Sequence, residues 1–209
     1  MRRLTTLFAG LLMLGLAACA GQIKSDVARF HKLPPPQGET VAIVPADPAK
    51  RGSLEFATYA NMIGAELGKL GYKPAAEGAT ADLEVVVDYS VSEGTEKLDT
   101  RPGTASISPY YYNWRSRAFY PYYGPYDPFW GPGLWNEPEV YSYTVYTRKL
   151  SMKILKGDAS KEMLFEGRVD SIGRDNRLPE VMPYLVQALF TDFPGQSGVT
   201  KRVKIDLPQ

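Results

Sequence analysis

The sequence predicts an α/β fold of the α+β type, with two helices and an open, mixed, largely antiparallel sheet. Three observations support this fold class. Two segments carry apolar residues at intervals of three and four, five segments are β-rich or alternate between apolar and polar positions, and a turn-forming sequence joins two of these. A long insertion rich in Tyr, Pro and Gly, residues 97–139, interrupts the series.

The first half of the domain is predicted to form a strand, a helix and a second strand. Residues 40–44 are a short β-branched run, which is typical of a buried strand. The helix extends from Ser53, a suitable N-cap, to Leu70, and Gly71 follows it where a left-handed residue is favoured. Residues 82–92 alternate as in a half-buried strand. The apolar face of the helix consists of Phe56, Ala60, Ile63, Leu67 and Leu70.

The second half of the domain begins with a predicted hairpin. Its arms are residues 140–155 and 163–172, joined by the turn-forming residues 156–161. The apolar pattern of the first arm changes phase, which suggests a β-bulge near Thr147 or Arg148.

A second helix and a closing strand complete the predicted domain. The helix begins at Pro179 and is stopped by Pro194 and Gly195. Residues 199–207 then alternate as a strand. The apolar positions of this helix are Met182, Leu185, Val186, Leu189, Phe190 and Phe193.

The N-terminus has the three parts of a bacterial export signal. Arg2 and Arg3 precede an apolar stretch, residues 7–16, and the small residues Ala17 and Ala18 follow it directly before Cys19. This arrangement resembles the lipobox of bacterial lipoproteins. The resemblance implies that residues 1–18 are a signal peptide cleaved before Cys19, which then carries a covalent N-acyl diacylglycerol. The apolar stretch is shorter than the roughly 20 residues needed to span a bilayer; cleavage of an ordinary secreted protein after Ala18 is the other alternative.

The lipid anchor implies a place in the cell. Ala20 follows the cysteine where retained inner-membrane lipoproteins typically carry Asp, so the resemblance implies the periplasmic face of the outer membrane, with inner-membrane anchoring left open. Residues 19–38 are predicted to be a tether because they are rich in proline and charge, with a short edge strand at residues 27–30 as an alternative. Residues 39–209 then form a single domain, interrupted by the insertion.

Charge and cysteine content argue against a nucleic-acid partner and an intramolecular disulfide. After cleavage the chain has 22 basic residues, which is 24 minus Arg2 and Arg3, against 23 acidic ones. Nucleic acid is therefore not an expected partner, since binding a phosphate backbone needs a basic surface. Cys19 is the only cysteine, so no intramolecular disulfide can form.

Several segments together resemble a family of Gram-negative lipoproteins defined as domain of unknown function 4136. They are SDVARFH at residues 25–31, VAIVP at 41–45, ADLEVVVDY at 81–89, LVQALFTDFPG at 185–195, and the helix that leads to Leu70, Gly71 and Tyr72. None of these segments is a catalytic signature. The resemblance implies architecture and an envelope location.

The insertion is the candidate binding surface. Between Tyr110 and Trp135, twelve of 26 residues are aromatic, and they are interleaved with Pro and Gly. The prolines exclude a regular helix or a central strand, so many of these rings must lie on a surface. The residues predicted to form the surface are Tyr110, Tyr111, Tyr112, Trp114, Tyr120, Tyr122, Tyr123, Tyr126, Trp130 and Trp135.

Three interpretations of the insertion stay open. It can cover an edge or face of the sheet, or form a contact surface for another envelope protein or a glycan, because Tyr and Trp combine stacking area with a polar tip. The third interpretation is contact with lipid, or disorder. Arg115 and Arg117 are the only cations between Tyr110 and Trp135, which argues against single-stranded nucleic acid.

Catalysis is not expected. The only histidine, His31, lies in the predicted tether, and no metal site or cofactor is indicated. The carboxylate pairs Glu93 with Glu96 and Asp170 with Asp175 have the spacing of ordinary loop charges. The sequence therefore predicts a non-catalytic structural or partner-binding module attached to the membrane by lipid. The alternative is a glycan-acting hydrolase that uses paired carboxylates and the aromatic insertion.

Overall fold

The computed structural model describes residues 21–76, 79–101, 110–121 and 139–207. The chain forms two compact units, one of residues 1–94 and 145–209 and the other of residues 95–144. Cys19 and the signal-peptide residues lie outside the described ranges. No helix among the described residues is long and apolar enough to cross a membrane.

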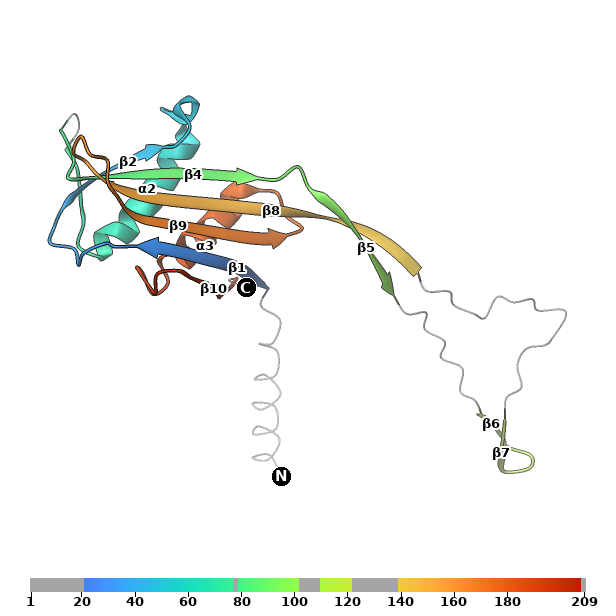
Figure 1. The fold of residues 1–209 in the computed structure, drawn as a ribbon. Helices are drawn as coiled ribbons and strands as arrows, with labels where there is room; N and C mark the ends of the chain where they lie inside the picture. Colours follow the sequence, from blue (N-terminus) through green and yellow to red (C-terminus); the bar gives the residue numbers. More distant parts are fainter. Residues whose placement is uncertain (1–20, 77–78, 102–109, 122–138, 208–209) are drawn as a thin grey trace, which may run out of the picture. The chain divides into compact units, whose positions relative to one another are not determined.

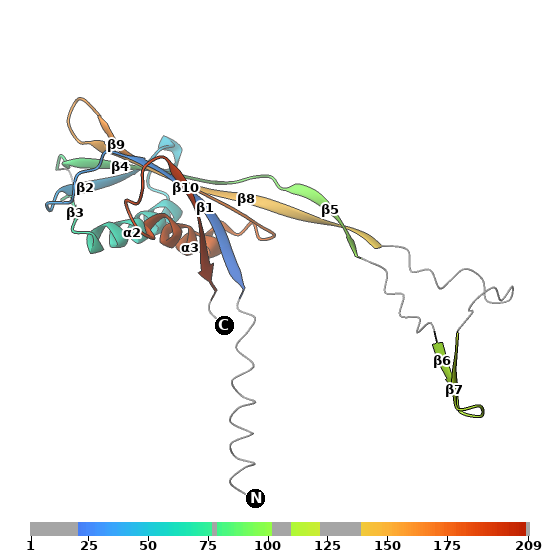
Figure 2. The same ribbon diagram turned by 60° about the horizontal axis from the view of Figure 1, so that its bottom comes forward.

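The first unit is a sheet with two helices on one of its faces (Figures 1 and 2). Its strands follow the spatial order β10-β1-β9-β8-β4-β2-β3. The helices are α2 (Leu54–Lys69) and α3 (Leu178–Phe190), and a 3-10 turn, η2 (Pro48–Lys50), precedes α2. The strands are β1 (Gln22–His31), β2 (Thr40–Pro45), β3 (Lys73–Pro74), β4 (Leu83–Val91), β8 (Glu139–Lys156), β9 (Met163–Gly173) and β10 (Val199–Asp206).

The sheet is mixed but largely antiparallel, which confirms the predicted fold class. Only β2 runs parallel to its neighbours, β3 and β4; the other neighbours pair in antiparallel register. The helix-facing residues form one hydrophobic core, which includes Val27, Val85, Met152, Phe165 and Leu185. The opposite face of the sheet carries charged residues, among them Asp88, Lys149, Lys153, Glu166 and Arg168.

Helix α2 has the predicted caps. The Ser53 hydroxyl accepts a hydrogen bond from the Phe56 amide at 3.3 Å, and Gly71 adopts a φ of 103° after the last turn. The structure adds Tyr59 to the buried face, where its ring meets that of Tyr89 edge-on at 4.9 Å. Its hydroxyl donates to Glu55 at 2.9 Å, which satisfies the polar tip of a buried ring.

The predicted hairpin of β8 and β9 is present, but the bulge position was wrong. Pairing is regular from Tyr146 to Ile154, and the register shifts between Ile154 and Leu155. The predicted phase change came from Arg148, which is 5% exposed and shares the helix-facing row with the apolar residues of β8. A buried cation therefore interrupted the apolar pattern without interrupting the ladder.

The predicted tether was wrong for residues 22–31. These residues form β1, which pairs with β9 on one side and β10 on the other, so the sheet begins before residue 39. Ser25 and Arg29 occupy two of its inward positions and are 1% and 4% exposed. Because these two inward residues are polar, the sequence of β1 does not show the apolar and polar alternation that predicts a strand.

The C-terminal segment matches its prediction with one change. Helix α3 ends at Phe190, about one turn before Pro194 and Gly195, because Thr191 leaves the helical conformation and Asp192 takes a positive φ of 57°. The closing strand β10 pairs with β1 from Val199 to Asp206.

The described part of the second unit consists of short strands that pair two by two. They are β5 (Thr95–Arg101), β6 (Tyr110–Asn113), β7 (Ala118–Pro121) and the first residues of β8. Strand β5 pairs with β8, and β6 pairs with β7 in an antiparallel hairpin. Pro121 lies at the end of β7, where a residue without an amide hydrogen is tolerated.

Candidate functional site

The candidate aromatic surface is described only in part. Tyr110, Tyr111, Tyr112 and Tyr120 occupy backbone positions in the β6–β7 hairpin. Trp114 lies in the connecting turn and is 80% exposed. The remaining predicted surface residues, Tyr122, Tyr123, Tyr126, Trp130 and Trp135, lie outside the described residues.

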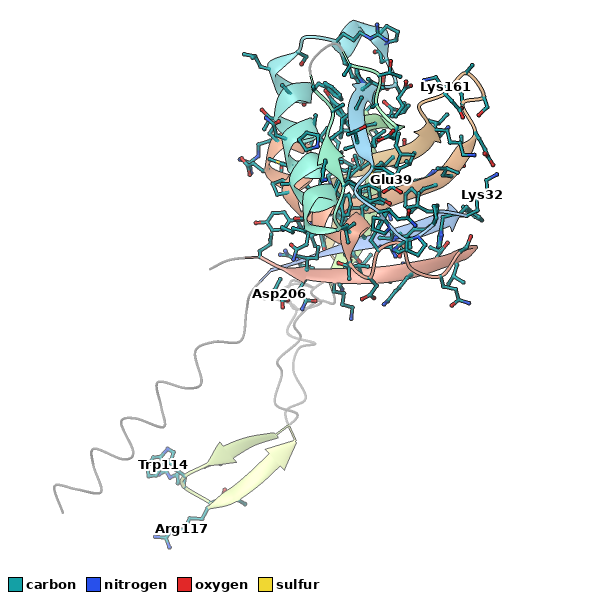
Figure 3. All side chains as sticks on the ribbon, turned by 90° about the vertical axis from the view of Figure 1, so that its left-hand side faces the viewer. Lys32, Glu39, Trp114, Arg117, Lys161 and Asp206 are labelled. Carbon is teal, nitrogen blue, oxygen red and sulfur yellow. The ribbon has the colours of Figure 1, made fainter. Side chains whose placement is uncertain are left out.

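The turn of this hairpin is held by Asn113. Its side-chain oxygen accepts hydrogen bonds from the amides of Arg115 at 3.0 Å and Ser116 at 3.4 Å, as in an Asx turn. Arg117 takes a φ of 50°, which returns the chain into β7. Figure 3 shows Trp114 and Arg117 at the turn end of the hairpin. A defined turn thus holds an exposed indole next to cationic side chains.

Strands β5 and β8 of the second unit carry a further set of exposed groups. Tyr141 donates its hydroxyl hydrogen to Asp99 at 3.0 Å, and the Arg101 guanidinium lies 4.8 Å from the centre of the Tyr141 ring. Leu98 and Val140 are 73% and 61% exposed. Sequence reasoning did not single out Tyr141 or Leu98, although Tyr141 and Tyr143 continue the Tyr-rich composition beyond residue 139.

His31 lies in folded structure, so its assignment to a solvated tether was wrong. It ends β1, with Nε2 3.0 Å from the Gly195 carbonyl oxygen and its amide donating to the Ser197 hydroxyl at 3.0 Å. The ring centre is 6.3 Å from that of Phe165. These contacts join the end of β1 to the segment after α3.

The carboxylates considered for catalysis occupy different environments. Asp175 accepts two hydrogen bonds from the Arg177 side chain, at 3.0 and 2.8 Å, and Arg177 lowers the pKa of that carboxyl. Asp170 lies in β9 opposite Asp26 and Lys149, and one of its oxygens is buried without a described hydrogen-bond donor. Among the residues that the structure describes, no cluster of His, Cys, Asp and Glu could hold a metal ion.

The most buried charge of the first unit is Arg29, which sequence reasoning missed. Its Nη2 lies 3.1, 2.9 and 2.7 Å from the carbonyl oxygens of Ala188, Leu189 and Thr191 at the end of α3. Burial lowers the pKa of the guanidinium, and the Asp192 carboxylate opposes that change. A cation at this position hydrogen-bonds to carbonyl groups that have no partner within the helix. It also interacts favourably with the negative end of the helix dipole.

A second buried arginine, Arg148, lies on β8. Its Nη2 donates to the Ser171 hydroxyl at 3.0 Å, and that hydroxyl donates to the Lys24 carbonyl oxygen at 3.0 Å. A Cβ atom on Gly173 would lie 2.5 Å from the same nitrogen, so this glycine leaves room for the guanidinium. Both arginines connect elements of the first unit and have structural roles.

Exposed ion pairs predict an acid-sensitive fold. Hydrogen bonds from Lys156 and Lys32 lower the pKa of Glu162 to about 2, from 4.5. Because the folded state holds the proton less tightly, this stabilisation is present above pH 4.5 and is lost as the pH falls towards 2. We expect the urea midpoint to fall over this range, and to fall less in Glu162→Gln. An identical pH profile in wild type and variant would contradict the prediction.

These observations define a class: a sheet with helices on one face, which carries an inserted unit with an exposed tryptophan. The family model described as Domain of unknown function (DUF4136) matches residues 28–195, and the chain belongs to this family. The family predicted from the sequence segments is thereby confirmed. A search of curated proteins found no match.

Among the solved structures that are similar to this chain is a PDZ domain protein from Parabacteroides distasonis ATCC 8503, with a TM-score of 0.48 and 16% sequence identity. The match covers 95% of this chain and 42% of the other, so this chain spans less than half the length of that protein.

Proposed function

We propose that this protein is a lipid-anchored envelope protein that binds a partner through its second unit and does not catalyse a reaction. The observation that carries the proposal is Trp114, which is 80% exposed in a turn ordered by Asn113. Exposing a large aromatic side chain forgoes the stabilisation of burial, roughly 1.5–3 kcal/mol. An ordered and exposed indole is therefore better explained by a contact that buries it.

Other described groups of the second unit suit a contact surface of mixed character. Arg115 and Arg117 follow Trp114 in the same turn, and Leu98 on β5 and Val140 on β8 are exposed apolar residues of the unit. Tryptophan, tyrosine and arginine are the residues most often found at binding hot spots. The partner that this chemistry fits is another envelope protein or a glycan.

The anchor follows from Cys19 and the lipobox that precedes it. A lipid-anchored protein on the periplasmic face of the outer membrane would meet both kinds of partner. His31 and Asp175 hydrogen-bond with Gly195 and Arg177 in the first unit.

Substitution of Trp114 tests the proposal. We expect Trp114→Ser to leave the free energy of unfolding within about 0.5 kcal/mol of wild type, since the side chain is exposed. The same substitution should reduce partner capture about tenfold or more, as loss of a hot spot does. Capture is measured with the tagged full chain from solubilised envelopes by quantitative mass spectrometry, and with purified peptidoglycan sacculi by sedimentation.

A matched control is available in the first unit. Leu54, at the start of α2, is 86% exposed, so Leu54→Ser removes a similarly exposed apolar side chain outside the proposed surface. Its capture should equal that of wild type. Equal recovery by Trp114→Ser and Leu54→Ser in both assays would overturn the proposal.

A further inference from the structure

The sheet of the first unit begins close to the proposed lipid anchor. Strand β1 starts at Gln22, three residues after Cys19. A chain spans at most about 3.6 Å per residue, so Gln22 lies within roughly 11 Å of the residue that would carry the lipid. Residues 22–31 are paired on both sides. An anchor at Cys19 would therefore hold the start of β1 at the membrane surface.

Two lysines face each other at this end of the sheet. The start of β1 lies beside the end of β10 (Figures 1 and 2), and Lys24 is the direct cross-strand partner of Lys204. Both residues are exposed. Directly opposed side chains have Cβ atoms about 4.5–5.5 Å apart, and like charges in such a pair destabilise a sheet. The pair therefore concentrates positive charge at the expense of stability.

The carboxylates on either side of this lysine pair have other partners. Asp26, two residues further along β1, accepts hydrogen bonds from Arg202 at 2.7 and 2.8 Å. Asp206, two residues further along β10, accepts a hydrogen bond from Gln22 at 2.8 Å. Among the residues that the structure describes, neither lysine of the pair forms an ion pair or a side-chain hydrogen bond. Both ammonium groups can therefore bind an anion from outside the described chain.

An exposed apolar side chain lies next to the lysine pair. Ser25 of β1 pairs with Ser171 of β9, and both are 1% exposed, so they face the helices. The residues next to them, Lys24 and Ile172, therefore share the opposite face of the sheet on neighbouring strands. Ile172 is 61% exposed. Binding to a membrane interface increases with buried apolar area and with electrostatic attraction to anionic lipid, and this end of the sheet offers both.

On the basis of the lipid anchor proposed above, we propose that Lys24, Lys204 and Ile172 form a docking surface for anionic phospholipid. The two ammonium groups would bind headgroup phosphates, which relieves their mutual repulsion, and the Ile172 side chain would enter the headgroup region. Each basic residue near an anionic membrane contributes about fivefold in affinity, or about 1 kcal/mol. The anchor raises the local lipid concentration, so a weak contact suffices to fix the direction in which the first unit projects from the membrane.

Acetylation footprinting of the mature chain on vesicles tests the docking surface. A hexahistidine tag in place of Cys19 attaches the chain to nickel-chelating lipid, so the result does not depend on acylation. The vesicles consist of phosphatidylcholine with or without phosphatidylglycerol, and mass spectrometry measures the acetylation rate of each lysine. We expect Lys24 and Lys204 to react about fivefold more slowly when phosphatidylglycerol is present, because an ammonium group held by phosphate keeps its proton.

Lys73 provides the matched control, because it is exposed on β3 at the opposite end of the sheet. Its acetylation rate should be the same on both kinds of vesicle. Lys24→Glu pairs with Lys204 and presents a carboxylate to the membrane, so it should abolish the difference in Lys204 rate between the vesicles. Lys73→Glu makes the same change of charge and should leave that difference as in wild type.

Three results would overturn the docking surface: equal rates at Lys24 and Lys204 on both kinds of vesicle, equal slowing of Lys73, or equal effects of Lys24→Glu and Lys73→Glu. Failure of the anchor is seen separately, because mass spectrometry of the native N-terminus would then show an unmodified Cys19 while the tagged chain still reports on lipid contact. Trp114→Ser should leave the footprint unchanged, so failure of the partner surface is distinguishable as well.

Discussion

Replacing Arg29 by methionine is expected to lower the free energy of unfolding by about 1.5–3 kcal/mol, the range for hydrogen bonds to a charged group. Methionine has a similar reach but no donor. The carbonyls of Ala188, Leu189 and Thr191 would then lose the cation that lies within 3.1 Å of each. Since these groups close α3 against β1, both elements should lose protection from hydrogen exchange together.

Arg202 provides the control for this substitution. It lies on the neighbouring strand β10 and pairs with Asp26 in an exposed, two-bonded contact of 2.7 and 2.8 Å. Arg202→Met should lower the free energy of unfolding much less than Arg29→Met does, because exposed ion pairs contribute little. Urea denaturation of both variants makes the comparison, and equal costs would show that Arg29 does not hold the end of α3.

Replacing Cys19 by serine is expected to move the protein from the membrane fraction to the soluble periplasmic fraction. A serine cannot carry the thioether-linked diacylglycerol, and each acyl methylene buried in a bilayer contributes about 0.8 kcal/mol. Because many such methylenes are lost at once, the expected change in membrane affinity is large.

A control variant and a mass measurement test this prediction further. Ala18→Gly keeps a small residue before Cys19, so this variant should remain in the membrane fraction. Mass spectrometry of the wild-type N-terminus should give an acylated Cys19 as the first residue. An unmodified thiol, or membrane association that survives Cys19→Ser, would contradict the lipid anchor.

Most helices and strands of the first unit could be predicted because their sequence patterns are local. Helix α2 has Ser53 before it and Gly71 after it, and both caps act within one turn. Strand β4 alternates because one face of the sheet is covered and the other is not. Such signals depend on a residue and its near neighbours.

Strand β1 was predicted only in part, as a short edge strand at residues 27–30 offered as an alternative to the tether, because its environment is assembled from distant segments. Arg29 contacts carbonyls of α3 that are about 160 residues away in the chain. The sequence alone does not show these partners, so an arginine and a serine at inward positions were interpreted as polar residues of a linker. The same reasoning applies to Arg148, whose partner Ser171 lies on the facing arm of the hairpin.

The candidate site was predictable in composition but not in conformation. The density of aromatic residues identified the insertion, and Trp114 is exposed as expected of a surface residue. The turn that presents it depends on the Asn113 side chain, a signal that the surrounding prolines concealed.

Site-specific photocrosslinking in living cells tests the proposed partner surface most directly. A photoreactive phenylalanine analogue replaces Trp114 in the full chain, and the same analogue replaces Leu54 as the control. We predict a discrete crosslinked product from position 114 that is absent from position 54, with an envelope protein or peptidoglycan as the attached partner. Identical products from both positions, or none from position 114, would contradict binding through this surface.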